Sequence, residues 1–185
     1  MAGRSASAYE RELRCLLEGE PAAVRRYARG LPVGDRTEFE RIIDAPYLVI
    51  RGAGSLGFDL VALRRDYAFP VEVKASAETV IRFTAASGRA EQQLAAHRRA
   101  VARVGLTVLY AYRRLGRQPD EAWRVFLASA LPERGVLRTI CRRLPNVSST
   151  AAGHGVLRWE EGMPLSQFLR QAAFLEERPA GAIPS

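Results

Sequence analysis

The chain has 185 residues, 48% of them hydrophobic, so it can bury the core of one compact domain, and global disorder is excluded. No apolar run approaches the ~20 residues of a membrane helix, and the N-terminal segment lacks the apolar part of a signal peptide. We therefore expect a soluble, cytoplasmic protein without a membrane partner. The two isolated cysteines, Cys15 and Cys141, exclude a disulfide framework and a structural zinc site.

The charge balance indicates a polyanion as partner, because 28 basic against 20 acidic residues leave a formal net charge of +8 that is spread through the chain. Four arginine clusters are candidates for phosphate contacts: Arg25, Arg26 and Arg29; Arg98, Arg99 and Arg103; Arg113, Arg114 and Arg117; and Arg142 and Arg143. Each cluster is equally consistent with a solvated helix face, so the pattern alone leaves both interpretations open.

The N-terminal part is expected to be helical. Apolar residues at helical spacing predict a first helix from about Ser7 to Glu18, and a second helix is expected at Ala22–Arg29. The segment Asp35–Glu38 has the pattern of a helix cap. We interpret 21–46 as a helical insertion.

Strand and helix patterns then predict the central fold. Three strand-like runs, a helix and two further strands follow in order at Tyr47–Arg51, Phe58–Leu63, Ala68–Ala75, Gly88–Val104, Leu106–Tyr112 and Trp123–Ala128. With the first helix, this order predicts an α/β fold with a mixed five-stranded sheet flanked by helices.

The C-terminal part is expected to be an appendage. Polar and small residues at 146–155 predict a flexible linker. A short strand at Val156–Trp159 and a helix at Pro164–Phe174 follow, and the last ten residues are expected to be disordered. The predicted organisation is thus a domain at 1–145, the linker, and the appendage at 156–185.

One basic residue differs from all the others. The chain has 27 arginines and a single lysine, Lys74, in the sequence Val71-Glu72-Val73-Lys74. Arginine cannot replace lysine where a compact ammonium group that can lose its proton is required, so this lysine indicates a chemical role. A Glu-x-Lys pair is also found on ordinary surface hairpins. Whether this pair belongs to an active site depends on the residues of the neighbouring strand.

That strand carries a second carboxylate. A hairpin centred on the peptide between residues 65 and 66 pairs Leu63 with Ala68 and therefore Asp59 with Glu72. Carboxylates so close are destabilising unless a cation lies between them. Lys74 shares a face with Glu72, because strand residues two apart do so. Hard oxygen ligands of this kind suit Mg²⁺ or Mn²⁺, which serve phosphodiester hydrolysis.

The run Gly52–Gly57 fits the GxGxxG pattern of dinucleotide-binding loops, but it leads into a strand rather than a helix. We therefore exclude a dinucleotide and expect no small-molecule cofactor. A glycine-rich loop beside Asp59 instead lets a phosphate backbone approach closely.

Three segments, Tyr9–Leu13, Arg51–Ala62 and Val71–Lys74, resemble the archaeal-type Holliday junction resolvases, a family of the PD-(D/E)XK nuclease superfamily that also occurs in viruses. The resemblance covers roughly residues 5–18 and 47–128. It implies a restriction-endonuclease-like core with the element order αβββαββ. It also implies that Asp59, Glu72 and Glu10 hold Mg²⁺, or Mn²⁺ in its place, and that Lys74 assists the attacking water. Phe58 stands where the superfamily name has proline, as is common among these resolvases.

Further site residues follow from the resemblance and from the arginine pattern. Arg51 and Ser55 match positions that in the family act on the DNA backbone or in catalysis. The other arginines expected to contact DNA are Arg11, Arg14, Arg82, Arg98 and Arg99. Gln92 and Gln93 lie where related nucleases sometimes place an active-site glutamine, and Gln92 is our candidate. His97, on the apolar face of its helix, is expected to pack or to face the junction.

The role of Glu10 stays open on the pattern alone. Ser7-Ala8-Tyr9-Glu10 is also a capping box, in which the glutamate returns a hydrogen bond to the helix start. Helical angles place Glu10 and Glu12 on opposite flanks of the apolar stripe, so periodicity does not choose between them. The resemblance alone selects Glu10.

Together these features predict a structure-selective endonuclease that makes paired symmetric cuts in four-way DNA junctions. We expect a homodimer, because a two-fold protein supplies two equivalent sites. If the source is viral, the location would be the host cytoplasm. The alternatives are another PD-(D/E)XK endonuclease, of the repair or restriction type, and a non-catalytic junction-binding protein.

Overall fold

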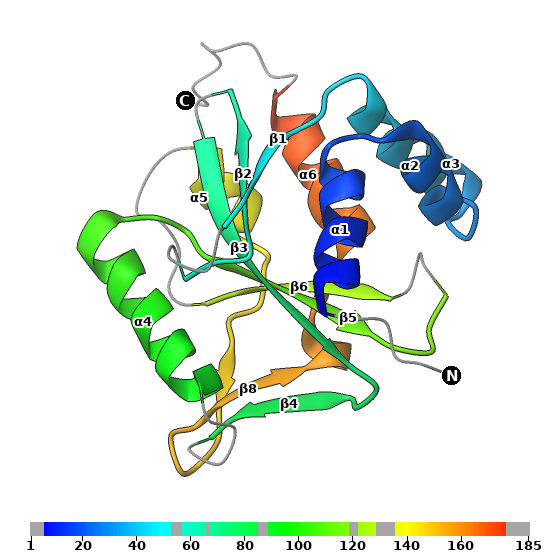
Figure 1. Cartoon of the computed structure of the whole chain (residues 1–185). Helices are drawn as coiled ribbons and strands as arrows, with labels where there is room; N and C mark the ends of the chain where they lie inside the picture. The colour runs from blue at the N-terminus through cyan, green and yellow to red at the C-terminus, as the bar shows by residue number, and fades with distance from the viewer. Residues whose placement is uncertain are drawn as a thin grey trace.

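The computed structural model describes residues 6–52, 57–65, 67–84, 89–118, 122–128 and 136–176. Within these ranges, helices surround a large sheet and a small one (Figure 1). The helices are α1 (Ala6–Leu17), α2 (Pro21–Ala28), α3 (Val33–Glu40), α4 (Arg89–Val104), α5 (Val136–Cys141) and α6 (Leu165–Glu176), with the 3-10 turns η1 (Arg41–Ile43) and η4 (Trp159–Glu161). The strands are β1 (Leu48–Arg51), β2 (Leu60–Arg64), β3 (Tyr67–Ser76), β4 (Val80–Phe83), β5 (Leu109–Arg114), β6 (Trp123–Leu127), β7 (Ser148–Ser149), β8 (Gly155–Arg158) and β9 (Met163–Pro164).

The large sheet is mixed and has the strand order β1-β2-β3-β5-β6-β9, and the small sheet has the order β4-β8-β7. In the large sheet β3 and β5 pair in parallel, whereas the other neighbours pair antiparallel. The predicted α/β class with a mixed sheet is therefore confirmed. The sheet has six strands rather than five, because Met163 and Pro164 form an additional edge strand, the place where a sheet tolerates proline.

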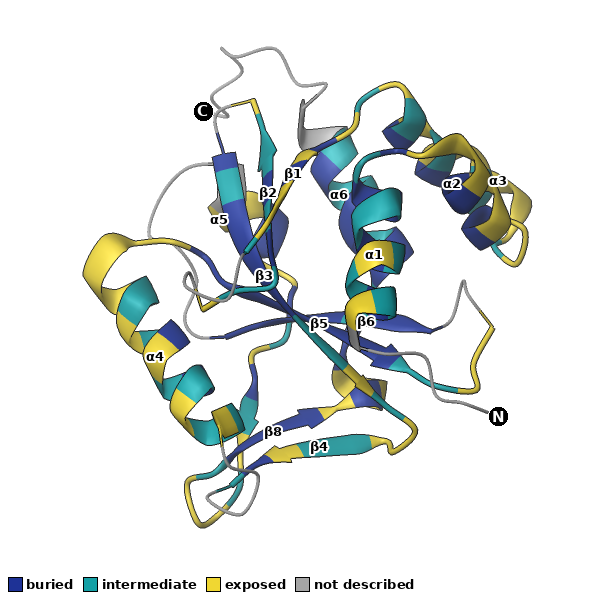
Figure 2. Ribbon diagram, viewed as in Figure 1, coloured by how far each residue is buried: buried dark blue, intermediate teal, exposed yellow. Residues whose placement is uncertain are grey.

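Alternate residues of the large sheet face two different layers, as the period of a strand requires. Leu109 and Ala111 of β5 belong to a core with α1, α2, α3, α5 and α6, on what we call the five-helix face. Tyr110 and Tyr112 belong to a second core with α4, β4 and β8, on what we call the α4 face. Figure 2 shows the central strands buried between the layers and the outer sides of the helices exposed.

The N-terminal helices largely follow the prediction. α1 and α2 each lie within one residue of the expected bounds. The predicted cap at Asp35–Glu38 is wrong, because α3 already begins at Val33. Asp35 lies in its first turn, where a negative charge stabilises the helix, and its carboxylate pairs with Arg170 of α6. The segment 21–46 is thus helical, and its being an insertion stays a prediction.

Two short elements, β4 and α5, were not predicted, because neither is long enough to show a period in the sequence. β5 begins at Leu109 rather than Leu106. α4 ends at Val104 and is followed by Gly105, whose φ is 70°. None of the helices in the described ranges is long and apolar enough to cross a membrane.

The segment 146–155, expected to be a flexible linker, contains β7 and the turn to β8. The backbone N of Thr150 donates to the carbonyl of His154 at 2.8 Å, and Gly153 has a φ of 81°. The polar and small residues that suggested a linker are those of a tight turn. The strand β8 and the helix α6 that follow pack into the two cores. The tail that we predict to be disordered lies, from residue 177 on, outside the described ranges.

Candidate active site

Asp59 lies immediately before β2, where the predicted hairpin register changes. The predicted pairing of Leu63 with Ala68 is confirmed. At Asp59, however, the backbone N donates to the carbonyl oxygen of Val71 at 3.2 Å. Asp59 is therefore not directly opposite Glu72, as the continued register would require, but displaced by one residue.

The carboxylate of Asp59 explains this displacement. Its Oδ2 accepts a hydrogen bond of 2.7 Å from the backbone N of Val73, taking the place of a strand carbonyl. The carbonyl of Asp59 itself accepts from the backbone N of Gly52 at 2.8 Å, on the side of β1. The Asp59 side chain is thus fixed against β3, beside the peptide that follows Glu72.

Two glycines before Asp59 are required by the backbone conformation. A Cβ at Gly52 would lie 1.8 Å from the carbonyl oxygen of Phe58, so only glycine fits where the chain passes itself. Gly57 has a φ of 72°, which a side chain disfavours. Residues 53–56 between them, including the candidate Ser55, lie outside the described residues.

Glu72 and Lys74 project together from β3, as predicted. They pair with Tyr110 and Tyr112 of β5 and so point to the α4 face. Lys74 Nζ donates to Glu72 Oε1 at 2.6 Å and to Oε1 of Gln93 on α4 at 3.0 Å. A glutamine of α4 therefore does join the cluster.

That glutamine is Gln93 rather than the candidate Gln92, which is exposed. The sequence pattern left the choice open because the two are neighbours on one helix, whose faces differ by about 100° per residue. The register of α4 against β3, which only the fold supplies, brings Gln93 to Lys74.

The two carboxylates lie in an unfavourable environment for negative charge. Burial raises the pKa of Glu72 from 4.5 to about 7; Lys74 lowers it and Asp59 raises it. Burial also raises the pKa of Asp59, the hydrogen bond from Val73 lowers it, and the Glu10 carboxylate raises it. Oε2 of Glu72 is buried and has no hydrogen-bond partner within the described part of the chain. Among the described residues, the cluster therefore has fewer positive groups and hydrogen-bond donors than its two carboxylates need.

The structure separates the two glutamates of α1 that the sequence pattern did not. Oε2 of Glu10 accepts from Arg51 at 3.1 Å, at the rim of the site. Glu12 instead accepts from Arg113 Nε at 3.1 Å and from Trp123 Nε1 at 3.0 Å, on the five-helix face. Glu10 is near enough for its charge to act on Asp59. The described residues contain, however, no group of three or more acidic, histidine or cysteine side chains placed to hold one metal ion.

His97 connects α4 to the backbone before Asp59. Its Nε2 lies 2.6 Å from the carbonyl oxygen of Gly57, and its Nδ1 lies 2.8 Å from the hydroxyl of Tyr110. Because a carbonyl only accepts, Nε2 carries the proton. Burial lowers the pKa of His97 and so favours the neutral ring, in which Nδ1 accepts from Tyr110. The ring stacks on Phe58 with centroids 4.6 Å apart. Of the two expected roles, packing is the one that these contacts give His97.

The arginines expected to contact DNA differ in their freedom to do so. Arg11, Arg82 and Arg99 are exposed. Arg14 pairs with Glu18 at 3.2 Å. Arg98 donates to the carbonyls of Ala128 at 3.1 Å and Val147 at 3.4 Å, so its guanidinium ties α4 to the end of β6.

Comparison with known proteins gives a likeness in structure but none in sequence. No protein-family model matches the chain, and no curated protein matches it. The solved structures that resemble it include Hjc, a Holliday junction resolvase of the archaeal hyperthermophile Archaeoglobus fulgidus, with 19% sequence identity and a TM-score of 0.41. The match covers 75% of this chain and 96% of that chain.

Proposed function

We propose that the chain is a Mg²⁺-dependent DNA endonuclease that resolves four-way junctions. One observation carries the proposal: the buried Oε2 of Glu72 has no partner among the described residues, next to the Asp59 carboxylate and to the only lysine of the chain. An unsatisfied buried carboxylate is costly in a fold and calls for a cation.

The residues present fit a hard divalent ion. Asp59 and Glu72 offer carboxylate oxygens, and Mg²⁺ is commonly bound through one or two carboxylates while it keeps several waters. Asp59 and Glu72 would hold the ion, with Mn²⁺ able to replace it. When bound, the ion supplies an activated water and neutralises charge that develops on the phosphate.

The remaining side chains have roles that follow from their contacts. Lys74, held by Gln93 at 3.0 Å, would orient the attacking water and donate to the phosphate oxygens. The Val73 amide keeps Asp59 in place. Arg51 at the rim would bind the DNA backbone, and Glu10 orients Arg51 through their 3.1 Å ion pair.

We further propose that the enzyme acts as a homodimer, because two symmetric cuts need two equivalent sites. An apolar surface supports this. Leu48 and Ile50, exposed by 67% and 48%, lie on the edge strand β1 and point to the α4 face. Leu48 pairs with Leu63 of β2, and Ile50 pairs with Val61. These two apolar rows cross β1 and β2, and along β2 they lead toward Asp59. A second copy covering these rows would bring two sites onto one surface.

The dimer is tested by replacing Leu48 and Ile50 together with glutamate and measuring the mass in solution by light scattering. The matched control is Val33→Glu, because Val33 is exposed by 79% on α3, away from these rows. We expect a monomer for the double variant and a dimer for the control. A double variant that remains dimeric would contradict this assignment of the interface.

The function is tested by incubating the protein with a mobile four-way junction, a duplex and a flap, each with and without Mg²⁺. We expect paired symmetric cuts in the junction that require the ion. Equal cutting of plain duplex would favour another endonuclease of the repair or restriction type. Junction binding without cutting in any divalent ion would favour the non-catalytic alternative.

A further inference from the structure

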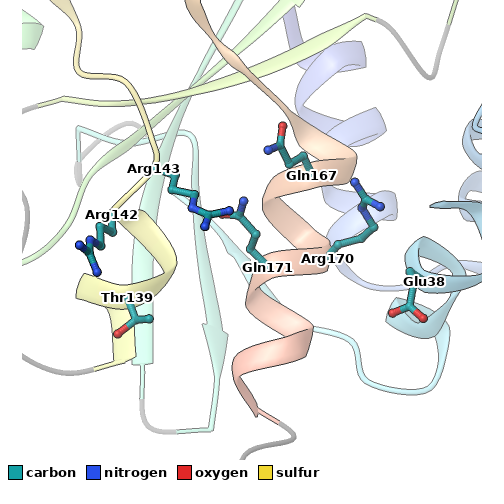
Figure 3. Close-up of a pocket in the computed structure, with 7 residues that line it drawn as sticks. All are labelled: Glu38, Thr139, Arg142, Arg143, Gln167, Arg170 and Gln171. Carbon is teal, nitrogen blue, oxygen red and sulfur yellow. The ribbon is translucent and has the colours of Figure 1, made fainter. Parts of the chain in front are cut away.

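A groove of about 750 Å³ lies between α3, α5 and α6 (Figure 3). These helices cover the five-helix face, whereas Glu72 and Lys74 point to the α4 face, so the large sheet separates the groove from the candidate active site. Three arginines line it: Arg142, Arg143 and Arg170. The groove is thus a basic site apart from the residues proposed for cleavage.

Two of its arginines are available for a ligand. Arg142 and Arg143 are exposed, and neither has a hydrogen bond or an ion pair from its side chain within the described ranges. Arg170 is held by Asp35 of α3. The carboxylate that lines the groove, Glu38, is itself engaged by Arg41 at 3.2 Å. Among the three arginines of the groove, those without a partner in the described part of the chain are therefore the two that follow α5.

The other lining residues favour a particular class of anion. Gln167 and Gln171 of α6 and Thr139 of α5 contribute amide and hydroxyl groups, and the described lining has no aromatic or aliphatic side chain. Figure 3 shows Arg143 and Gln171 pointing toward each other across the gap between α5 and α6. Such a lining has no aromatic ring on which a base could stack, but it offers donors for phosphate oxygens.

We infer that this groove is a second DNA-binding site, which takes the sugar–phosphate backbone of a duplex arm on the face opposite the candidate active site. The choice of DNA as the ligand rests on the proposed function. The contacts are to phosphate, so binding there is independent of sequence. An arm that leaves the active site and bends around the protein would supply the backbone.

The experiment measures binding of a labelled four-way junction and of a plain duplex by fluorescence anisotropy, in EDTA so that cleavage plays no part. Arg142→Gln/Arg143→Gln is compared with Arg65→Gln/Arg89→Gln, a control that removes the same charge from two exposed positions that belong to none of the four arginine clusters. Both variants carry a net charge of +6, which is +8 less the two arginines. Circular dichroism melting verifies that both remain folded.

We expect the groove variant to bind about tenfold more weakly at moderate salt, and the slope of log affinity against log salt to fall by about 1.8, the value for two phosphate contacts. The control should keep the wild-type slope. Arg142→Lys/Arg143→Lys should restore most of the slope, because lysine retains the charge that releases counterions.

Equal losses in the groove variant and the control would show a general charge effect and overturn the inference, as would an unchanged slope in the groove variant. A protein that binds DNA through the groove but cuts no junction would contradict the proposed function and leave the groove inference standing. If the protein cuts junctions but the groove variant keeps the wild-type slope, the groove inference is contradicted and the proposed function stands.

Discussion

Two glutamates, one on each face of the sheet, differ in how their negative charge is balanced; the side chain of Glu12 is exposed by 12% and that of Glu72 by 3%. Glu12 on the five-helix face accepts hydrogen bonds from Arg113 and Trp123, and the Arg113 guanidinium also lies 5.4 Å from the centre of the Tyr9 ring. Glu72 on the α4 face has Lys74 on one oxygen and no described partner on the other. The residue type is the same, and both side chains are largely shielded from solvent. The missing partner, rather than burial, is what indicates a site for a cation.

The largest effects are expected on the α4 face and concern cleavage. Asp59→Asn removes a charge that would hold the ion, and Lys74→Ala removes the only lysine. We expect each to lower the rate of junction cleavage by at least about 100-fold, as the loss of a transition-state contact does. Lys74→Arg should not rescue the rate, because a guanidinium differs in shape and proton affinity from an ammonium group. Cleavage of a labelled junction in single turnover measures this.

Junction binding is the control for these variants. Both side chains are proposed for chemistry, so affinity measured without divalent ions should stay within a few-fold of wild type. Glu12→Gln, on the other face, should cut at the wild-type rate per folded molecule. Loss of binding in both Asp59→Asn and Lys74→Ala would show that the site is assigned wrongly.

On the five-helix face the expected effect is on stability. Glu12→Ala leaves the Arg113 guanidinium, exposed by 10%, without its carboxylate, and breaking a buried pair in this way costs about 3 kcal/mol of the free energy of unfolding. Urea unfolding measures it. The matched control is Glu160→Ala, because Glu160 pairs with Arg114 at 3.5 Å but is exposed by 69%, and such pairs contribute about 0–1 kcal/mol. Equal losses in the two variants would contradict the structural role of Glu12.

The pH dependence of stability should identify Glu72. Its pKa is about 7 in the folded protein against an ordinary 4.5, so between these values the folded state binds a proton that the unfolded state has lost. The free energy of unfolding should therefore fall as pH rises from 4.5 to 7 and stay low above, by an amount on the order of 3 kcal/mol. Urea unfolding in EDTA at pH 5 and pH 8 measures the difference.

Glu72→Gln should lose most of this pH dependence, whereas Glu78→Gln, a change of an exposed glutamate, should keep it. Mg²⁺ should stabilise the wild type at pH 8 but not Glu72→Gln, since a ligand stabilises only the state that binds it. A wild-type protein whose stability rises between pH 5 and pH 8 would contradict the unsatisfied state of this carboxylate.

The pattern of the chain predicted what local periodicity and pairing control. The hairpin register from Leu63 and Ala68 followed from the strand period and the turn, and so did the common face of Glu72 and Lys74. The displacement of Asp59 could not be predicted, because it depends on a side-chain hydrogen bond to Val73 that competes with the ladder.

Contacts between distant elements could not be predicted either, because local periodicity does not contain them. Glu10 and Glu12 have equivalent positions in the helical pattern, and only the packing of α1 between Arg51 and Arg113 separates them. The turn at 150–153 has the same residue types as a linker, and pairing with β4 is what makes it part of the fold. The local sequence determines the conformation of such a segment, whereas its position in the fold is determined by the elements that it packs against or pairs with.

The smallest expected effect compares two neighbouring glutamines of α4. Gln93 accepts a hydrogen bond of 3.0 Å from Lys74, whereas Gln92 is exposed. Gln93→Ala should slow junction cleavage by about five- to tenfold, because losing one hydrogen bond costs about 1 kcal/mol and leaves the ammonium group less well oriented. Gln92→Ala should cleave at the wild-type rate. If Lys74 acts through its position, Gln93→Glu, which keeps an acceptor, should slow cleavage less than Gln93→Ala. Equal rates for Gln92→Ala and Gln93→Ala would show that Glu72 alone is enough to hold the lysine.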